Sequence, residues 1–176
     1  MICALLTRRI TICVILCLTL LGCSSRFLTY VLPSRSMEPT IPHNSLITVD
    51  TFAYKNKLSS RWDIIAFHYP LSTNSVFAMR VAGLPGERIF VSDGKLYINN
   101  TITHLPDNLT NVVYKTHKNQ KYANLSPFLI PRGHVFILGD NSDTANDSRF
   151  WGPLSKNLIV GKVLSWKVAK LLGTGL

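Results

Sequence analysis

Beyond residue 40, hydrophobic residues gather in short runs separated by polar and turn-forming residues, which is a pattern typical of β-strands. Runs rich in Ile, Val and aromatic residues predict strands at 44–50, 62–69, 75–82, 134–138 and 158–168. Residues 88–99 form two alternating arms around Asp93-Gly94, a dipeptide favoured in tight hairpin turns. The polar segment 101–126 predicts a variable excursion, and helical spacing is absent from this part of the chain. The pattern predicts a mainly β, antiparallel domain with coiled or barrel-like sheets.

The first 28 residues differ, because their apolar positions are continuous. Arg8 and Arg9 precede an uncharged run from Ile10 to Cys23. A helix over this run would span about 21 Å, which is short for a bilayer core of roughly 30 Å. A helix that continues to Leu28 would span about 28 Å and serve as a permanent anchor. We therefore predict an N-terminal cytoplasmic tip and membrane helix over residues 1–28, followed by one extracytoplasmic domain over residues 29–176.

Two other interpretations of the N-terminal segment remain open. Residues 20–24 resemble a bacterial lipoprotein cleavage site, in which Cys23 would carry the lipid. A plain cleaved signal peptide is the third possibility. All three deliver the body outside the cytoplasm, because Arg8 and Arg9 keep the N-terminus inside. The hydrophobic residues at 27–32 are then expected to rest in the lipid surface.

Charge and cysteine content narrow the possible partners. The chain has 19 Lys and Arg against 9 Asp and Glu, a formal net charge of +10, but the basic residues are scattered and form no nucleic-acid-binding motif. We therefore predict membrane lipids rather than nucleic acid as a partner of the basic surface. All four cysteines lie within the first 23 residues. Residues 24–176 accordingly contain no disulfide, no cysteine-based metal site and no thiol nucleophile.

Four segments carry the candidate chemistry. They are Pro-Ser-Arg-Ser-Met-Glu-Pro-Thr at 33–40, Trp-Asp-Ile-Ile-Ala-Phe-His-Tyr-Pro at 62–70, Arg-Val-Ala-Gly-Leu-Pro-Gly-Glu at 80–87 and the polar loop 139–153 that begins Gly-Asp-Asn-Ser. In this order behind an apolar N-terminus, they resemble the type I signal peptidases, serine proteases with a Ser/Lys dyad. The resemblance extends over almost all of residues 24–170. It implies cleavage of signal peptides from exported preproteins, without a cofactor, on the outer face of the bacterial inner membrane.

The same resemblance assigns roles to individual residues. Ser36 matches the nucleophile, and its backbone N–H together with the Ser34 hydroxyl would form the oxyanion hole. In the family a desolvated lysine removes the proton of the serine, and a further serine orients that lysine. Asp147 and Arg149 match an ion pair beneath the active site. Arg80 is expected to give structural support.

Two positions depart from the family pattern. Met79 stands where the lysine belongs, and a thioether cannot accept a proton. Ala145 occupies the position of the orienting serine. Natural loss or weakening of activity, recruitment of another base and deliberate inactivation would each explain Met79. The paired change favours natural divergence. His68, on the strand predicted beside 75–82, is the first alternative base to consider.

The sequence therefore predicts a membrane-bound signal peptidase-like endopeptidase, inactive or attenuated because of Met79 and Ala145. The alternative is a non-catalytic homologue that binds peptides or assists secretion, pilus or conjugation assembly. Asp140, Asp143 and Asp147 are spaced like metal ligands, but a calcium loop requires Gly at its sixth position, where this chain has Ala145. No metal site is predicted.

Overall fold

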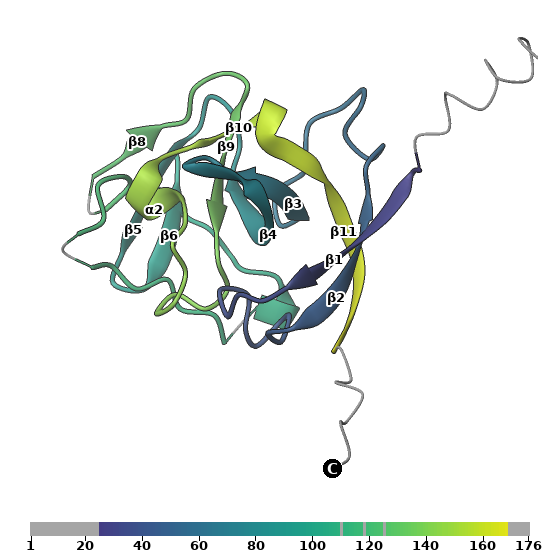
Figure 1. Ribbon diagram of the computed structural model, residues 1–176. Helices are drawn as coiled ribbons and strands as arrows, with labels where there is room; N and C mark the ends of the chain where they lie inside the picture. The colour runs from purple at the N-terminus through teal and green to yellow at the C-terminus, as the bar shows by residue number, and fades with distance from the viewer. Residues whose placement is uncertain (1–24, 110, 118, 125, 169–176) are drawn as a thin grey trace, which may run out of the picture.

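The computed structural model describes residues 25–109, 111–117, 119–124 and 126–168. Almost all regular structure in these residues is β (Figure 1). The strands are β1 (Phe27–Leu32), β2 (Ser45–Asp50), β3 (Ile64–Tyr69), β4 (Ser72–Gly83), β5 (Arg88–Ser92), β6 (Lys95–Ile98), β7 (Thr101–Ile102), β8 (Phe128–Leu129), β9 (His134–Leu138), β10 (Leu154–Ser155) and β11 (Ile159–Val168). Three short helical turns accompany them: η1 (Asp107–Leu109), α2 (Ser148–Trp151) and η2 (Lys156–Leu158).

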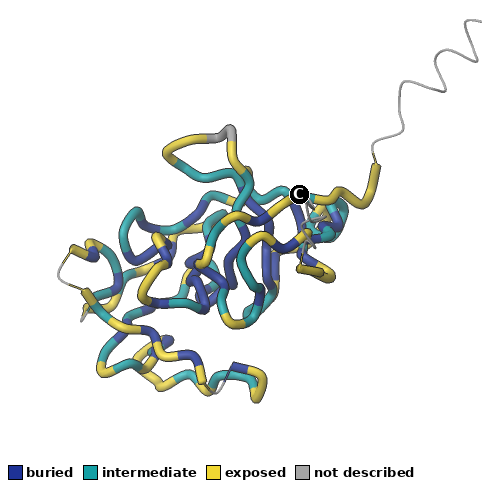
Figure 2. The backbone as a smooth tube through the Cα atoms, turned by 60° about the horizontal axis from the view of Figure 1, so that its bottom comes forward, coloured by how far each residue is buried: buried dark blue, intermediate teal, exposed yellow. Residues whose placement is uncertain are grey.

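The strands form two antiparallel sheets. The larger sheet has the order β1-β2-β11-β3-β4-β9-β10, and the smaller has the order β7-β6-β5-β8. One apolar cluster packs against the larger sheet and includes Ile47, Ile65 and Phe67, whereas a second lies between the smaller sheet and Phe136. Figure 2 shows the buried positions gathered in the interior, with exposed positions mainly in loops and chain ends. The predicted mainly β, antiparallel fold is confirmed.

The barrel-like part of the prediction was wrong. Among the described residues, the edge strands β1 and β10 of the larger sheet do not pair with each other, so the sheet stays open. Closure would require a long ladder between the two edges. β10 has only two residues, and both pair with β9, which leaves no strand long enough to close the ring.

The start of the body also differs from the expectation. Phe27 and Leu28 begin β1, where they pair with Asp50 and Val49 of β2, so the helix proposed for the anchor does not continue to Leu28. Residues 1–24, which carry the anchor prediction and Cys23, lie outside the described residues. Within residues 25–168, apart from the three undescribed positions, no helix has the length and apolarity needed to cross a membrane.

β4 is the strand that connects the two sheets and positions the candidate site. It has 12 residues and lies between β3 and β9 in the larger sheet. Its last residues contribute to the second apolar cluster through Ala82. The turn that follows leads into the β5–β6 hairpin, whose predicted turn at Asp93-Gly94 is confirmed by positive φ at both residues. β4 therefore brings position 79 into the middle of the molecule.

Candidate active site

Ser34 and Ser36 lie together on the turn that follows β1. The Ser36 N–H donates to Ser34 Oγ at 3.1 Å, and the two hydroxyl oxygens are 2.6 Å apart. Ser36 is buried, with 6% of its surface exposed. The two residues expected to form the oxyanion hole are thus neighbours, but their donor groups bond to each other. A substrate oxygen would have to replace Ser34 Oγ as the acceptor of the Ser36 N–H.

The polar loop holds this turn in place. The Asn141 N–H donates to the Ser36 carbonyl at 2.9 Å, and the Thr144 hydroxyl donates to the Arg35 carbonyl at 3.3 Å. Gly139 lies between the two segments. A Cβ at this position would come within 2.5 Å of both the Ala145 Cβ and the Ser36 carbonyl oxygen. The Ser36 carbonyl and the Ala145 side chain therefore both pack against Gly139, where a larger residue would not fit.

Met79 lies on β4 with 3% of its surface exposed and belongs to the same apolar cluster as Met37, the residue after Ser36. Its register partner on β3 is Ile65, and Phe77 pairs with Phe67. Residues directly opposite in a β-ladder project from the same face of the sheet. Met79, Phe77 and Phe67 therefore share one face of β3 and β4.

The segment after Ala145 covers that face. Rings of Phe67 and Tyr69 contact Trp151, with centroids 6.3 and 6.2 Å apart. The Asn146 side-chain amide donates to the Tyr69 hydroxyl at 2.9 Å. Met79 and Ala145 consequently lie on the same side of the sheet, in surroundings that offer position 79 mainly apolar contacts.

Arg80 joins β4 to both site segments. Its guanidinium makes a two-pronged ion pair with the Asp140 carboxylate, at 2.8 and 2.7 Å, and both side chains are buried. The Asp140 carboxylate also accepts the Thr40 hydroxyl at 2.5 Å. Sequence reasoning considered Asp140 only as a metal ligand and missed this role. A buried arginine on a core strand needs a buried counter-ion. That requirement could have identified an acidic residue such as Asp140 as the partner of Arg80.

Asp147 and Arg149 form a second, fully buried ion pair. Two N–H groups of Arg149 donate to the two Asp147 oxygens, each at 2.8 Å, and neither side chain is exposed. Asp147 also accepts the Gly139 N–H at 3.0 Å. Arg149 donates further to the Ser142 hydroxyl and the Lys115 carbonyl, both at 2.6 Å. These hydrogen bonds hold the loop in one conformation. The bond to the Gly139 N–H also positions the glycine that packs against Ser36 and Ala145.

The three loop carboxylates considered as metal ligands each bind a different cation. Asp140, Asp143 and Asp147 pair with Arg80, Lys115 and Arg149 respectively. In the part of the chain that the structure describes, no three His, Cys, Asp or Glu side chains converge on a possible metal position. The carboxylates stabilise the loop electrostatically.

His68 lies on β3 next to β4, but it projects from the face opposite to Met79. His68 pairs with Val76, and this pair is adjacent to the Phe67–Phe77 pair in the ladder. Because successive strand residues point to opposite faces, His68 projects away from the face that Phe67 and Met79 share. The His68 Nδ1 atom is buried without a hydrogen-bond partner among the described residues. Strand alternation therefore prevents His68 from taking over the role of a base at position 79.

Two further ionisable groups near these segments are unsuited to act as a neutral-pH base. The hydrogen bond with His43 lowers the pKa of Glu38. Burial, followed by the charge of Asp140, raises the pKa of Tyr114. At neutral pH Glu38 is thus a weakly basic carboxylate and Tyr114 a neutral phenol.

The site is thus a turn with two adjacent serines, connected to the β-sheet through the polar loop and its two buried Arg–Asp pairs, with Met79 and Met37 in one apolar cluster. Residues 5–166 match the family described as signal peptidase, peptidase S26, and the chain belongs to that family. Family membership confirms the resemblance seen in the sequence.

Individual relatives agree with this assignment. The chain is 28% identical to signal peptidase I of Pseudomonas aeruginosa, over 81% of this chain and 66% of that protein. It is 30% identical to the chloroplastic thylakoidal processing peptidase 1 of Arabidopsis thaliana, over 81% of this chain and 43% of the relative. Signal peptidase IB of Staphylococcus aureus is 29% identical, over 76% and 74% of the two chains. The chain thus spans just under two thirds of the Pseudomonas protein and less than half of the Arabidopsis one.

One solved structure is also similar. It is the crystal structure of a signal peptidase I from Enterococcus faecalis, with a TM-score of 0.48 and 33% sequence identity. The match covers 62% of this chain and 98% of the Enterococcus chain.

Proposed function

We propose that this protein is a membrane-bound signal peptidase-like serine endopeptidase that acts on exported preproteins and whose hydrolytic step is attenuated. Membership of the signal peptidase family supports the activity and the class of substrate. In this proposal Ser36 attacks the carbonyl of the peptide bond, and its N–H and the Ser34 hydroxyl stabilise the oxyanion. The substrate lies extended beside a strand, as in other peptide-recognition sites of β-sheets.

The main support for attenuated hydrolysis is the environment of the Ser36 hydroxyl. Its hydrogen-bond partner among the described residues is another hydroxyl, Ser34, which is not a base. Position 79, where the family has its lysine, offers a buried thioether. General-base assistance contributes about 10²- to 10⁴-fold to such reactions, so its loss slows cleavage by a comparable factor.

The proposal is tested by incubating the full chain, in detergent or vesicles, with a preprotein and following the products by mass spectrometry. Slow release of the leader at a single junction, abolished by Ser36→Ala, is the expected result. The proposal is wrong if cleavage persists in Ser36→Ala, or if the unmodified chain cleaves as fast as relatives that contain the lysine.

A non-catalytic, peptide-binding homologue is the second candidate. It is favoured by the simultaneous absence of both proton-transfer residues, at Met79 and Ala145, while the supporting pairs Arg80–Asp140 and Asp147–Arg149 remain. Such a protein would bind leader peptides during secretion, pilus or conjugation assembly. A leader peptide with a photoreactive group at its junction would then crosslink to the Ser34–Ser36 turn and stay intact.

For localisation we propose a single N-terminal span in the bacterial inner membrane, with residues 29–176 on the extracytoplasmic side. The exposed apolar side chains of Phe27 and Val31, at the start of the body, support contact with the lipid surface. The alternative is a lipoprotein anchored at Cys23. Labelling with a radioactive fatty acid separates the two, because Cys23→Ser would abolish the label of a lipoprotein and leave a spanning protein unchanged.

A further inference from the structure

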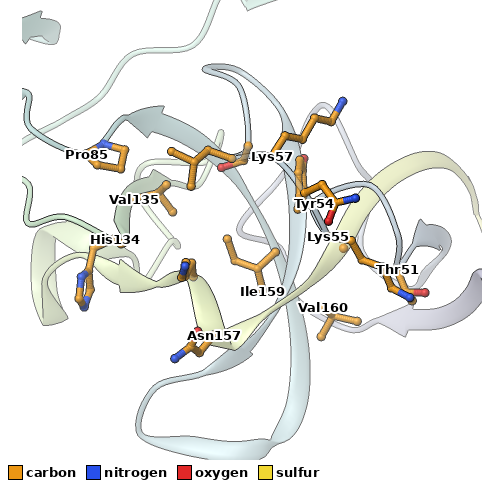
Figure 3. Close-up of a pocket in the computed structure, with 16 residues that line it drawn as sticks. Thr51, Tyr54, Lys55, Lys57, Pro85, His134, Val135, Asn157, Ile159 and Val160 are labelled. Carbon is orange, nitrogen blue, oxygen red and sulfur yellow. The ribbon is translucent and has the colours of Figure 1, made fainter.

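A cavity of about 610 Å³ lies away from the serine turn. Its lining comes mainly from Thr51 and residues 54–59, the turn before β9, and η2 with the start of β11. Figure 3 shows Ile159 between two groups of side chains, with His134 and Asn157 on one side and Tyr54, Lys55 and Thr51 on the other. The Ser34–Ser36 turn and the 139–149 loop do not line it, so the cavity is separate from the candidate active site.

Among the described residues, every charged side chain that lines this cavity is positive. Lys55, Lys57 and Lys156 contribute ammonium groups, His134 lies at the rim, and the lining contains no Asp or Glu. None of the three lysines forms an ion pair within the described part of the chain. Lys55 lies over the Phe52 ring, with its nitrogen 3.4 Å from the ring centre. One carboxylate outside the lining partly compensates Lys57. The hydrogen bond from Arg26 is the main reason that the pKa of Asp50 lies below its ordinary value, and the charge of Lys57 lowers this pKa further. The excess of cations around the cavity still favours an anionic ligand.

The wall also contains an unsatisfied hydrogen-bonding group. Ser59 is 5% exposed, and its buried hydroxyl has no partner among the described residues. Burying a hydroxyl without a partner costs free energy, and rotation about its Cα–Cβ bond would turn it toward an oxygen in the cavity. The remaining wall is partly apolar, with Ile159, Val160 and the exposed Leu58. The cavity thus combines cations, a hydroxyl and an apolar surface.

The position of the cavity favours a membrane lipid as the anionic ligand. Thr51, which lines the cavity, donates its hydroxyl to the Arg26 carbonyl at 3.0 Å, and its N–H donates to the same carbonyl at 2.9 Å. Arg26 follows closely on the apolar run 10–23 of the sequence. A chain anchored through that run would hold the cavity near the headgroups of the bilayer.

We propose that this cavity binds the phosphate headgroup of an anionic phospholipid in the leaflet that the domain faces. The lysines pair with the phosphate, and Leu58 and Val160 contact the glycerol and the first acyl carbons. The inference rests on the membrane anchoring proposed above. Binding of one lipid in this cavity would fix the orientation of the domain on the membrane.

The test is calorimetric titration of the full chain in a neutral detergent with soluble dihexanoyl phosphatidylglycerol. Dihexanoyl phosphatidylcholine and inorganic phosphate are the comparison ligands. We expect saturable binding of phosphatidylglycerol, with both comparison ligands about tenfold weaker or more. Replacing Lys55, Lys57 and Lys156 by Gln should weaken binding by about tenfold or more, since each lysine contributes to attraction of the phosphate. Ser59→Ala should weaken it by about twofold to tenfold, through loss of one hydrogen bond.

The matched control replaces by Gln three exposed cations that do not line the cavity: Arg88, Lys95 and Lys121. This control should bind phosphatidylglycerol as the unmodified chain does. Equal weakening in both triple variants would overturn the proposal, because it would show general surface charge. Equal affinity for phosphatidylcholine, or for inorganic phosphate, would overturn it as well. Since no peptide is present, the result is independent of whether Ser36 cleaves a preprotein.

Discussion

The hydroxyl oxygens of Ser34 and Ser36 lie 2.6 Å apart, so the expected nucleophile is hydrogen-bonded to its neighbour and not to a base. The same Ser34 oxygen accepts the Ser36 N–H. The turn therefore satisfies these polar groups with its own atoms. Two hydrogen bonds join this turn to the polar loop, from the Asn141 N–H to the Ser36 carbonyl and from the Thr144 hydroxyl to the Arg35 carbonyl.

Gly139→Ala should both destabilise the protein and disturb the serine turn. The added Cβ would come within 2.5 Å of the Ser36 carbonyl oxygen and of the Ala145 Cβ, and neither atom is at the end of a flexible side chain. Overpacking of this kind costs about 1–3 kcal/mol. Urea unfolding measures the loss. The control is Gly139→Ala combined with Ala145→Gly, which removes one of the two clashes and should recover part of the stability; no recovery would contradict the close packing described here.

Arg149→Met should be strongly destabilising. It leaves the Asp147 carboxylate buried without its partner, and breaking a buried ion pair from one side costs about 3–5 kcal/mol. The double change Arg149→Met with Asp147→Leu should cost less, because no unpaired charge remains. Denaturant midpoints of the two variants test this. A double variant less stable than Arg149→Met would contradict the prediction, because it would show that the unpaired Asp147 carboxylate does not destabilise the fold.

Asp63 should contribute a pH-dependent part of stability. Burial raises the pKa of Asp63, but hydrogen bonds from Lys162, the Ser60 N–H and the Tyr54 hydroxyl together outweigh it and hold the pKa below its ordinary value. A carboxylate with a lowered folded-state pKa stabilises the protein above its unfolded pKa of about 3.9, and this stabilisation is lost as the pH falls through the folded value.

Between about pH 5 and pH 2, the unmodified chain should therefore lose more unfolding free energy than Asp63→Asn, by about 1 kcal/mol after allowance for solvent screening. Urea unfolding at a series of pH values measures the difference. Asp93→Asn, at an exposed hairpin turn, is the control and should follow the unmodified chain. Parallel curves for Asp63→Asn and the unmodified chain would show that the Lys162 contact has no net effect on stability.

Much of the fold could be predicted because the strands of the core are short runs rich in Ile, Val and aromatic residues, bounded by polar and turn-forming residues. The predicted runs at 44–50, 62–69, 75–82 and 134–138 overlap β2, β3, β4 and β9, and the hairpin matches β5 and β6. β1 was missed, because its apolar residues continue the apolar run before them and local pattern does not separate the two. Its pairing with β2 is a long-range contact that only the folded chain reveals.

The candidate site was predicted less completely than the fold. The resemblance to the family indicated the Asp147–Arg149 ion pair, which the structure contains. The roles that it assigned to Ser34, Ser36 and Met79 stay predictions. Sequence could not show that Asp140 binds Arg80 and Thr40, because these residues come from three distant segments. It also left the face of His68 undecided, since the strand register that settles it depends on the pairing of β3 with β4.

The central claim is that Ser36 can attack a peptide bond and that activity is attenuated because positions 79 and 145 lack the family's lysine and serine. The direct test is the cleavage rate of a preprotein by Met79→Lys combined with Ala145→Ser, followed by mass spectrometry. A lysine at this 3%-exposed position would be desolvated, which lowers its pKa toward neutrality and makes it a usable base. The account predicts a rate about 100-fold or more above that of the unmodified chain, abolished by adding Ser36→Ala. A folded double variant that cleaves no faster than the unmodified chain would contradict it.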